Sequence, residues 1–337
     1  MTKKRALITA RAFWTSGQEA EAALKTAGFT TAYSPEAGPY SAERLAPLLQ
    51  DYEASVCSSD QYNAALFEAC PDLAVVSRCG VGIDSVDIAA ATAAGVIVTN
   101  TPGAMTDAVA DYTFALLLSV ARRVAESYAT MLAGGWGDYT GVLVCGKTLG
   151  LVGFGQIGQG VARRAAGFGM KILAYDPALA AQNTLPPGLP PIAFVEFEEL
   201  LAQSDFVSVH APSLPETKHL FNAARFAQMK PTAYLINTAR GALVDETALI
   251  AALETRQIAG AALDVFSQEP LPADHPLRSA PRCVLTPHNA FNAIEAAGAM
   301  SLISAQNVIA LWQGERPASV CNPAVWDSPC LRLKRGI

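Results

Sequence analysis

The sequence predicts an α/β protein in which parallel sheets are covered by helices on both faces. Short apolar runs, which are typical of buried strands, alternate with helical segments along most of the chain. Near the middle of the chain, a turn with the pattern Gly153-x-Gly155-x-x-Gly158 joins one such strand to a helix. The 337 residues are enough for two domains with separate cores.

Composition and charge exclude several classes of protein. The net charge of −6 argues against a nucleic-acid surface, which needs a basic patch. The segment Met1–Arg5 is basic, but Arg11 interrupts the apolar run that follows, so we predict no secretory signal. The apolar helical segment 108–120 is short and contains Asp111, so we predict no membrane span. The seven cysteines lack C-x-x-C spacing, which favours reduced thiols in a cytoplasmic protein.

The residues before the glycine turn predict a domain of their own. Its strands are short runs rich in Ala and Val, and glycines such as Gly28 and Gly95 end its helices. Residues 33–39 are expected to form a loop. The predicted strands are 6–10, 54–57, 74–77 and 96–99, and the predicted helices are 18–26, 42–49, 61–69 and 86–94.

A turn at Asn100–Gly103 is expected to act as a hinge between this domain and the next. A long helix, 106–132, follows, with Thr106 as its expected N-cap. Its apolar residues occupy more than one face, so burial against a second subunit is one explanation. In the glycine-rich arm after it, Trp136 is either an interface anchor or a cap on its own core. We therefore expect a homodimer formed through this helix and the arm.

The stretch 148–177 predicts a nucleotide-binding βαβ unit. Strand 148–152 leads through the glycine turn into a helix that ends at Gly167–Gly169, and strand 171–175 follows. The three glycines have distinct roles: the first permits the tight turn, the second lets a pyrophosphate approach the backbone, and the third lets helix and strand pack closely.

The cofactor is predicted to be NAD. Its phosphates would bind the N–H groups at the helix start, at Gln156 and Ile157. Asp176, about twenty residues past the glycines, would accept hydrogen bonds from the adenosine ribose and repel a 2′-phosphate. Pro177 stands where a cationic residue would otherwise favour NADP.

The remaining elements continue the same alternation. The proline-rich segment 185–191 is expected to be a loop. A last long helix can return the chain to the N-terminal domain, which predicts a discontinuous domain of residues 1–100 and 297–337 around a nucleotide-binding domain of residues 101–296. The predicted strands are 206–210, 232–237, 259–264 and 283–286, and the predicted helices are 197–203, 221–228, 246–254 and 293–312.

Three ionisable residues follow separate strand ends and are expected to converge, because ligands bind at the carboxyl ends of parallel strands. Arg240 can bind a carboxylate through two hydrogen bonds and polarise the adjacent carbonyl. His288 is the expected proton donor, and Glu269 would stabilise its imidazolium form so that the acid persists at working pH. Alone, each has a simpler interpretation as an ion pair, a solvated loop residue or a packing residue, but their joint placement favours catalysis.

The segments 237–241, 264–270 and 286–289, together with the glycine turn and Arg78-Cys79-Gly80-Val81-Gly82-Ile83-Asp84, resemble the D-isomer-specific 2-hydroxyacid dehydrogenases of the phosphoglycerate and lactate dehydrogenase type. The resemblance covers nearly the whole chain. It implies a Rossmann NAD-binding domain and a flavodoxin-like substrate domain. It also implies NAD-dependent, reversible hydride transfer between a D-2-hydroxy acid and its 2-oxo acid.

The resemblance also implies roles for further residues. Asp264 would hold the nicotinamide carboxamide, and Thr238 and Ala239 would contact the cofactor. Val81 and Gly82 would offer backbone N–H groups to the substrate carboxylate.

Arg78 either binds a substrate anion, as in phosphoglycerate-type members, or pairs with Asp84. The run Asn289-Ala290-Phe291-Asn292 departs from the Gly-rich run of many members and is closer to the lactate-type branch. Glu269, where formate dehydrogenases have Gln, argues against that activity. An NADH-sensing, co-repressor-like interaction protein and a phosphite-oxidising enzyme remain as alternatives.

Other reactive side chains have structural interpretations. Cys79 is expected to be a small buried side chain rather than a nucleophile, and His210 to close a strand end. His219 and His275 are expected on the surface. Because metal-ligand spacing is absent, we predict no metal.

Overall fold

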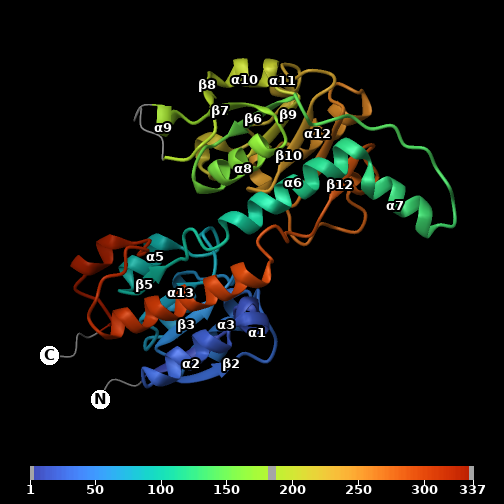
Figure 1. Cartoon of the computed structure of the whole chain (residues 1–337). Helices are drawn as coiled ribbons and strands as arrows, with labels where there is room; N and C mark the ends of the chain where they lie inside the picture. Colours follow the sequence, from blue (N-terminus) through green and yellow to red (C-terminus); the bar gives the residue numbers. More distant parts are fainter. Residues whose placement is uncertain (1–3, 181–186, 334–337) are drawn as a thin grey trace. The chain divides into compact units, whose positions relative to one another are not determined.

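The structure of the protein, a computed structural model, describes residues 4–180 and 187–333. The first three residues of the basic N-terminus and the first two of the proline-rich segment 185–191 lie outside this part. The chain divides into two compact units: unit 1 comprises Met1–Met105 and Asn292–Ile337, and unit 2 comprises Thr106–Phe291 (Figure 1). Each unit contains one parallel sheet with helices packed on it.

Unit 1 has a five-stranded parallel sheet in the order β2-β1-β3-β4-β5, which is the flavodoxin order and confirms the predicted fold. The strands are β1 (Arg5–Ile8), β2 (Thr30–Tyr33), β3 (Ala54–Cys57), β4 (Val75–Arg78) and β5 (Ile97–Thr99). The helices are α1 (Arg11–Ser16), α2 (Gln18–Thr26), α3 (Ala42–Leu49), α4 (Ala64–Ala69), α5 (Ile88–Ala93) and α13 (Ile294–Trp312), and a 3₁₀ turn, η4 (Pro323–Asp327), follows.

Helix α13 is the central helix of unit 1, although it comes from the C-terminal part of the chain. It packs against α1, α2 and β4 and buries residues along its length, among them Met300 and Leu311. Among the described helices it is the one long and apolar enough to cross a membrane, and half of that apolar stretch is buried inside the protein. After it, Asn322 bonds to the backbone of β5, so the C-terminal segment completes this sheet.

Unit 2 has a seven-stranded parallel sheet in the order β12-β11-β10-β9-β6-β7-β8, which is the doubly wound Rossmann arrangement. The strands are β6 (Thr148–Val152), β7 (Lys171–Tyr175), β8 (Ala193–Phe194), β9 (Phe206–Val209), β10 (Tyr234–Asn237), β11 (Gly260–Leu263) and β12 (Cys283–Leu285). The α-helices are α6 (Thr106–Arg122), α7 (Val124–Leu132), α8 (Gln156–Gly167), α9 (Pro177–Ala180), α10 (Phe197–Gln203), α11 (Ala223–Phe226) and α12 (Glu246–Glu254). The 3₁₀ turns are η1 (Pro215–Thr217), η2 (Gly241–Leu243) and η3 (Pro276–Ser279).

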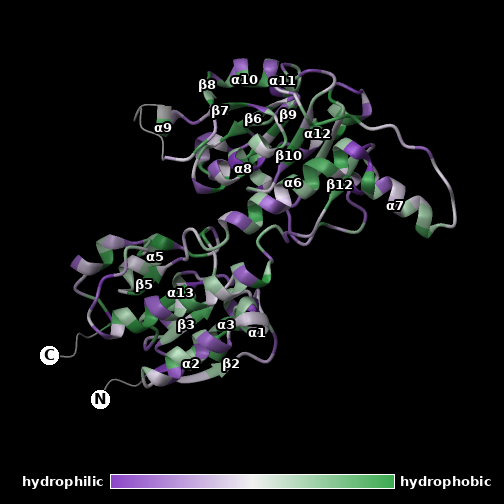
Figure 2. Cartoon of the chain, viewed as in Figure 1, coloured by the Kyte–Doolittle hydropathy of each residue, from purple (hydrophilic) through white to green (hydrophobic). Residues whose placement is uncertain are grey.

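The core of unit 2 lies on both faces of its sheet. One cluster, with Leu151 and Phe154, packs under α6 and α8, and the other, with Leu235 and Leu263, packs under α10 and α12. Figure 2 shows hydrophobic residues concentrated along the strands, with hydrophilic residues on the outer faces of the helices. The reversal of strand order falls between β6 and β9, where doubly wound folds bind their ligands.

The predicted helix 106–132 is wrong as a single element. It is broken at Arg123, whose backbone φ of 56° is left-handed and ends the right-handed helix α6. The Arg123 guanidinium bonds to Glu126 and stacks over the ring of Tyr139, which ties the start of α7 to the arm. The Val142 N–H also donates to the Ala121 carbonyl at 2.9 Å, so side-chain and backbone contacts, rather than a continuous helix, hold the arm.

Candidate active site

The carboxyl ends of β11 and β12 are joined by the carboxylate of Asp264. This buried side chain accepts hydrogen bonds from the Thr286 hydroxyl at 2.6 Å, from the Asn289 N–H at 2.9 Å and from the Ala290 N–H at 2.8 Å. Burial raises the pKa of Asp264, and these hydrogen bonds partly offset that effect. The His288 N–H also donates to the Asp264 carbonyl, so the residue that directly follows β11 fixes the turn that carries His288.

His288 and Glu269 form a close pair. The Nδ1 atom of His288 lies 2.6 Å from Oε2 of Glu269, whose Oε1 accepts the Phe266 N–H at 2.9 Å. Burial acts to raise the pKa of Glu269, but His288, the Phe266 N–H and Arg240 outweigh it, so that the net pKa is lowered. Glu269 therefore stays a carboxylate, and because it occupies Nδ1, Nε2 is the ring nitrogen left to face a reactant.

Arg240 is held in place by the loop that follows β10. Asn237 donates from Nδ2 to the Arg240 carbonyl at 2.9 Å and accepts the Ala239 N–H at 3.0 Å. Gly241, the next residue, packs directly on the chain after β11, because a Cβ there would lie 1.9 Å from the carbonyl carbon of Phe266. This close approach brings the Arg240 loop beside the Glu269 loop, and the Arg240 charge contributes to the lowered pKa of Glu269.

The glycine turn between β6 and α8 is shaped for a pyrophosphate. Gly153 has φ +90°, and a Cβ there would lie 2.6 Å from the backbone of His210, so a side chain is excluded. Gly155 has nothing within 4 Å of where its Cβ would be, which leaves the backbone open to a ligand. No side chain caps the start of α8 at Gln156 and Ile157, so its first N–H groups are available to phosphates. A Cβ on Gly158 would meet the Gly153 carbonyl at 2.5 Å, which explains the third glycine.

Asp176 lies at the end of β7, beside this turn. Its Oδ2 accepts the Phe154 N–H at 2.8 Å, and its Oδ1 accepts the N–H groups of Ala178 and Leu179, each at 3.0 Å. The carboxylate is thus oriented by backbone, and Oδ2, which accepts a single hydrogen bond, retains accepting capacity for a ribose hydroxyl. The residues present fit the adenosine end of a dinucleotide.

Two further predicted cofactor residues lie at the same sheet edge. Thr238 is buried and its hydroxyl bonds to Thr113 of α6 at 3.0 Å, while Ala239 is half-buried beside Arg240. His210 follows β9, and burial lowers its pKa to about 3, so the ring is neutral and bonds to the Ser208 hydroxyl at 2.9 Å. This agrees with a structural role for His210.

The predicted substrate residues Arg78, Val81 and Gly82 belong to unit 1, at and after the end of β4. Arg78 donates to the Ser59 hydroxyl at 3.5 Å. Cys79 is buried against the Ser304 hydroxyl, and burial raises the pKa of its thiol to about 12, which supports a packing role. The candidate catalytic residues and the glycine turn, in contrast, all belong to unit 2.

The sequence reasoning missed three positioning groups: Asn237, Gly241 and Thr286. Each of them stands in a segment at a strand end that the sequence marks as functional. Their positioning roles were not predictable, because their contacts depend on which strands are neighbours. The assembled site can hold an anion, keep a carboxylate charged and exchange a proton through an imidazole.

Comparisons with known proteins identify this arrangement. Residues 114–290 match the model of the D-isomer specific 2-hydroxyacid dehydrogenase NAD-binding domain. A glyoxylate reductase of Thermofilum pendens is 44% identical over 85% of this chain and 86% of its own length. The crystal structure of the TT0316 protein from Thermus thermophilus covers 94% of this chain and 99% of its own, with a TM-score of 0.84 and 37% identity. That of a glyoxylate reductase from Paecilomyes thermophila covers 95% and 99%, with a TM-score of 0.81 and 32% identity. The chain belongs to the D-isomer-specific 2-hydroxyacid dehydrogenases.

Proposed function

We propose that this 2-hydroxyacid oxidoreductase reduces a small 2-oxo acid of the glyoxylate type with NADH. Relatives named glyoxylate reductase, 44% identical over most of the chain, support the substrate class. The observation that carries the proposal is the 2.6 Å contact between His288 and Glu269 at the strand ends, beside the Arg240 loop. We assign catalysis to these three residues.

The roles follow from charge and geometry. The guanidinium of Arg240 binds the substrate carboxylate and polarises the neighbouring carbonyl. Glu269 holds His288 by Nδ1 and balances its positive charge, so that Nε2 gives its proton to the carbonyl oxygen as that oxygen becomes negative. In the reverse direction the same nitrogen accepts the proton. When bound, the nicotinamide cofactor supplies the hydride.

We further propose NADH rather than NADPH as the preferred cofactor. Asp176 presents a carboxylate at the end of β7, held by three backbone N–H groups, so it cannot swing away from a ribose phosphate. A 2′-phosphate would meet this negative charge, whereas a ribose hydroxyl would donate to it. Exchanging Asp176→Ser should reduce the preference for NADH over NADPH in kcat/KM by about tenfold or more, since one charge repulsion is removed. An unchanged ratio would contradict this assignment.

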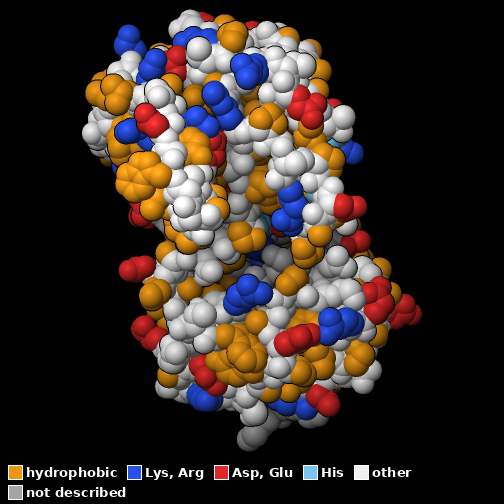
Figure 3. Space-filling model, turned by 90° about the vertical axis from the view of Figure 1, so that its right-hand side faces the viewer, with side chains coloured by type: hydrophobic (Ala, Val, Ile, Leu, Met, Phe, Trp, Pro, Cys, Tyr) orange, Lys and Arg blue, Asp and Glu red, His pale blue; other side chains and the backbone are white. Residues whose placement is uncertain are grey.

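The same proposal includes a homodimer formed through α7 and the arm after it. Hydrophobic side chains are exposed along this segment, and Figure 3 faces the side of the molecule that carries it. They are Val124, Tyr128, Met131, Leu132, Trp136 and Leu143, of which Trp136 is 91% exposed. An apolar surface of this extent indicates a protein contact. Light scattering should give twice the chain mass, and Leu132→Ser with Trp136→Ser should give one chain mass.

A panel of 2-oxo acids tests the reaction itself. Glyoxylate, hydroxypyruvate, pyruvate, phenylpyruvate and phosphohydroxypyruvate are compared under steady-state conditions with NADH. His288→Ala should lower kcat by about two to four orders of magnitude while NADH binding is retained. His219→Asn, an exposed histidine that also has a left-handed backbone, is the matched control and should keep full activity. If His288→Ala were as active as the wild type, His288 could not be the proposed proton donor.

The comparisons do not favour the alternative of an NADH-sensing interaction protein, because the relatives are named as reductases and dehydrogenases. Saturable turnover on one acid would exclude a purely sensing role. Binding of NADH without turnover on any acid of the panel would instead support it.

A further inference from the structure

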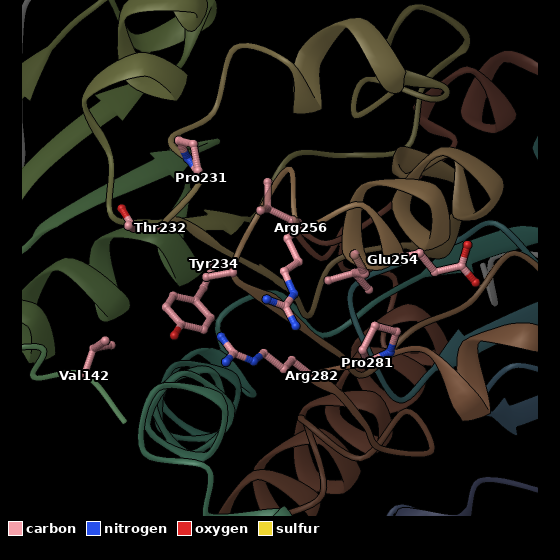
Figure 4. Close-up of a pocket in the computed structure, with 11 residues that line it drawn as sticks. Val142, Pro231, Thr232, Tyr234, Glu254, Arg256, Pro281 and Arg282 are labelled. Carbon is pink, nitrogen blue, oxygen red and sulfur yellow. The ribbon is translucent and has the colours of Figure 1, made fainter. Parts of the chain in front are cut away.

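A cavity of about 480 Å³ opens at the end of the unit 2 sheet opposite the catalytic residues (Figure 4). It is lined by residues at or just before the amino ends of neighbouring strands: Tyr234 begins β10, Ala259 precedes β11 and Arg282 precedes β12. Because the strands are parallel, Asp264 and His288 lie at their other ends. The cavity is therefore a separate site within the same unit.

Most of the cavity wall is apolar. The side chains that form it come from α12, the strand starts and the arm: Val142, Pro231, Leu253, Ile258 and Pro281. The ring of Tyr234 is buried and stacks on Phe206 with 5.3 Å between ring centroids, which makes that side of the wall rigid. The volume suits a small organic molecule.

Two arginines supply the charge of the cavity. Arg256 and Arg282 belong to separate turns, and Figure 4 shows both guanidinium groups directed into the space beside Tyr234. Both side chains are exposed, and neither guanidinium makes a hydrogen bond or ion pair with any residue in the described ranges 4–180 and 187–333. Glu254, the carboxylate in the lining, points away from them in the same view.

The backbone holds these arginines in an unusual conformation. Arg256 has φ 56° and Arg282 has φ 53°, in the left-handed region that residues other than glycine and asparagine rarely adopt. Both turns thus accept backbone strain while placing two positive charges at one cavity with no carboxylate between them. Like charges so placed repel each other unless an anion lies between them.

We propose that this cavity binds a small, doubly charged oxyanion between Arg256 and Arg282. Each guanidinium can donate two parallel hydrogen bonds to a phosphate or a carboxylate, so a phosphate or a dicarboxylate satisfies both arginines. The apolar wall takes the carbon skeleton of an organic member of this class. Such a ligand ties the turns that precede β11 and β12, the two strands that carry Asp264 and His288 at their far ends.

Calorimetric titration of the full-length protein tests the site with inorganic phosphate and with succinate, at constant ionic strength. Saturating NADH is included so that phosphate does not occupy the glycine turn. Arg256→Gln and Arg282→Gln should each weaken binding about tenfold or more, since each removes charge-assisted hydrogen bonds. Arg163→Gln, an exposed arginine on α8, should leave binding unchanged. Binding of phosphate alone or succinate alone supports the site and identifies the geometry of its anion.

The Arg240→Gln variant separates this site from the substrate site. If the titrated anion binds beside the catalytic residues, Arg240→Gln abolishes the signal and the proposal is overturned. Equal affinity of the wild type and Arg282→Gln overturns it as well. Thermal unfolding provides a second readout: phosphate should raise the Tm of the wild type but not of Arg282→Gln, because only a ligand bound to the folded state stabilises it.

Discussion

Removal of the imidazole at position 210 should abolish one specific component of the acid sensitivity of this protein. His210 follows β9, packs against the glycine turn and bonds to the Ser208 hydroxyl as a neutral ring. Burial lowers its pKa from 6.5 to about 3. In the unfolded chain the ring is protonated below pH 6.5, whereas in the folded protein it stays neutral until about pH 3. Stability is therefore complete above pH 6.5 and declines as the pH falls below it.

The magnitude follows from the two values. Between pH 6.5 and pH 3 the unfolded state binds one more proton than the folded state, so the free energy of unfolding falls by up to about 1.4 kcal/mol per pH unit. Between pH 7.5 and pH 5.0 this amounts to about 2 kcal/mol. At pH 5.0 the folded ring is still almost wholly neutral, so the expected loss depends mainly on the unfolded chain.

Urea unfolding at several pH values, for the wild type and for His210→Gln, measures this quantity. Every other titrating group is shared by the two proteins, so the difference between their unfolding free energies isolates the imidazole. This difference should shrink or reverse by about 2 kcal/mol on going from pH 7.5 to pH 5.0. Parallel curves over that range would refute the reasoning, because they would mean that the folded ring titrates like the unfolded one.

Three further outcomes are expected at the catalytic site. Gly241→Ala places a Cβ 1.9 Å from the Phe266 carbonyl carbon, so it should lower the free energy of unfolding in urea by about 1–3 kcal/mol. It should also lower kcat/KM by about a hundredfold, because the Arg240 loop is displaced. Wild-type kinetics would show that the Arg240 loop and the Glu269 loop need not touch. Asp264→Asn puts an NH₂ group where three donors now point and should lower kcat about a hundredfold with the fold intact by circular dichroism. Because the pKa of Glu269 is lowered, its stabilising contribution is complete above the ordinary value of 4.5 and is lost only as the pH falls below it. The stability advantage of the wild type over Glu269→Gln should therefore shrink as the pH falls from 4.5 to about 3, a range well below the ordinary pKa of histidine, so that titration of the paired ring does not contribute. A constant advantage across that range would contradict the lowered pKa.

Much of the fold was predictable because buried strands and amphipathic helices carry strong patterns. The strands 54–57, 148–152 and 171–175 and the helices 18–26 and 246–254 agree with the predictions to the residue. The pattern failed where burial is slight: β2 is partly exposed along its length, so its sequence lacks an apolar run. The short helix α1 and the two-residue strand β8 also went undetected, because neither is long enough to show a period.

Helix starts were misplaced for one physical reason. Three predicted helices begin two or three residues later than expected, after Asn63, Asp87 and Asn222, and each of these side chains accepts a hydrogen bond from the N–H three residues on. These are N-caps that the sequence displays plainly. Each of the three helices begins at the residue that follows its capping side chain.

The members of the candidate site could be proposed from the sequence, but their geometry could not. The strand-end rule selected Arg240, Glu269 and His288 from the sequence, and the close contact of the last two agrees with that expectation. The left-handed backbone of His288, with φ 53°, was not predictable, since it arises from hydrogen bonds to Asp264 on the neighbouring strand. Such constraints come from strands that are adjacent in space and distant in sequence.

Unit 1 consists of two segments separated in the sequence by unit 2, and this determines which unit can fold first during synthesis. All of unit 2 lies in one continuous span, so it can fold as soon as Phe291 has emerged. The N-terminal segment of unit 1 is synthesised earlier, yet its sheet lacks its principal covering helix until Trp312 is translated. The bridge from Thr99 to Val320 can form only after that. During this interval the nascent N-terminal segment exposes apolar strand surface that chaperones recognise, while the NAD-binding domain is already complete.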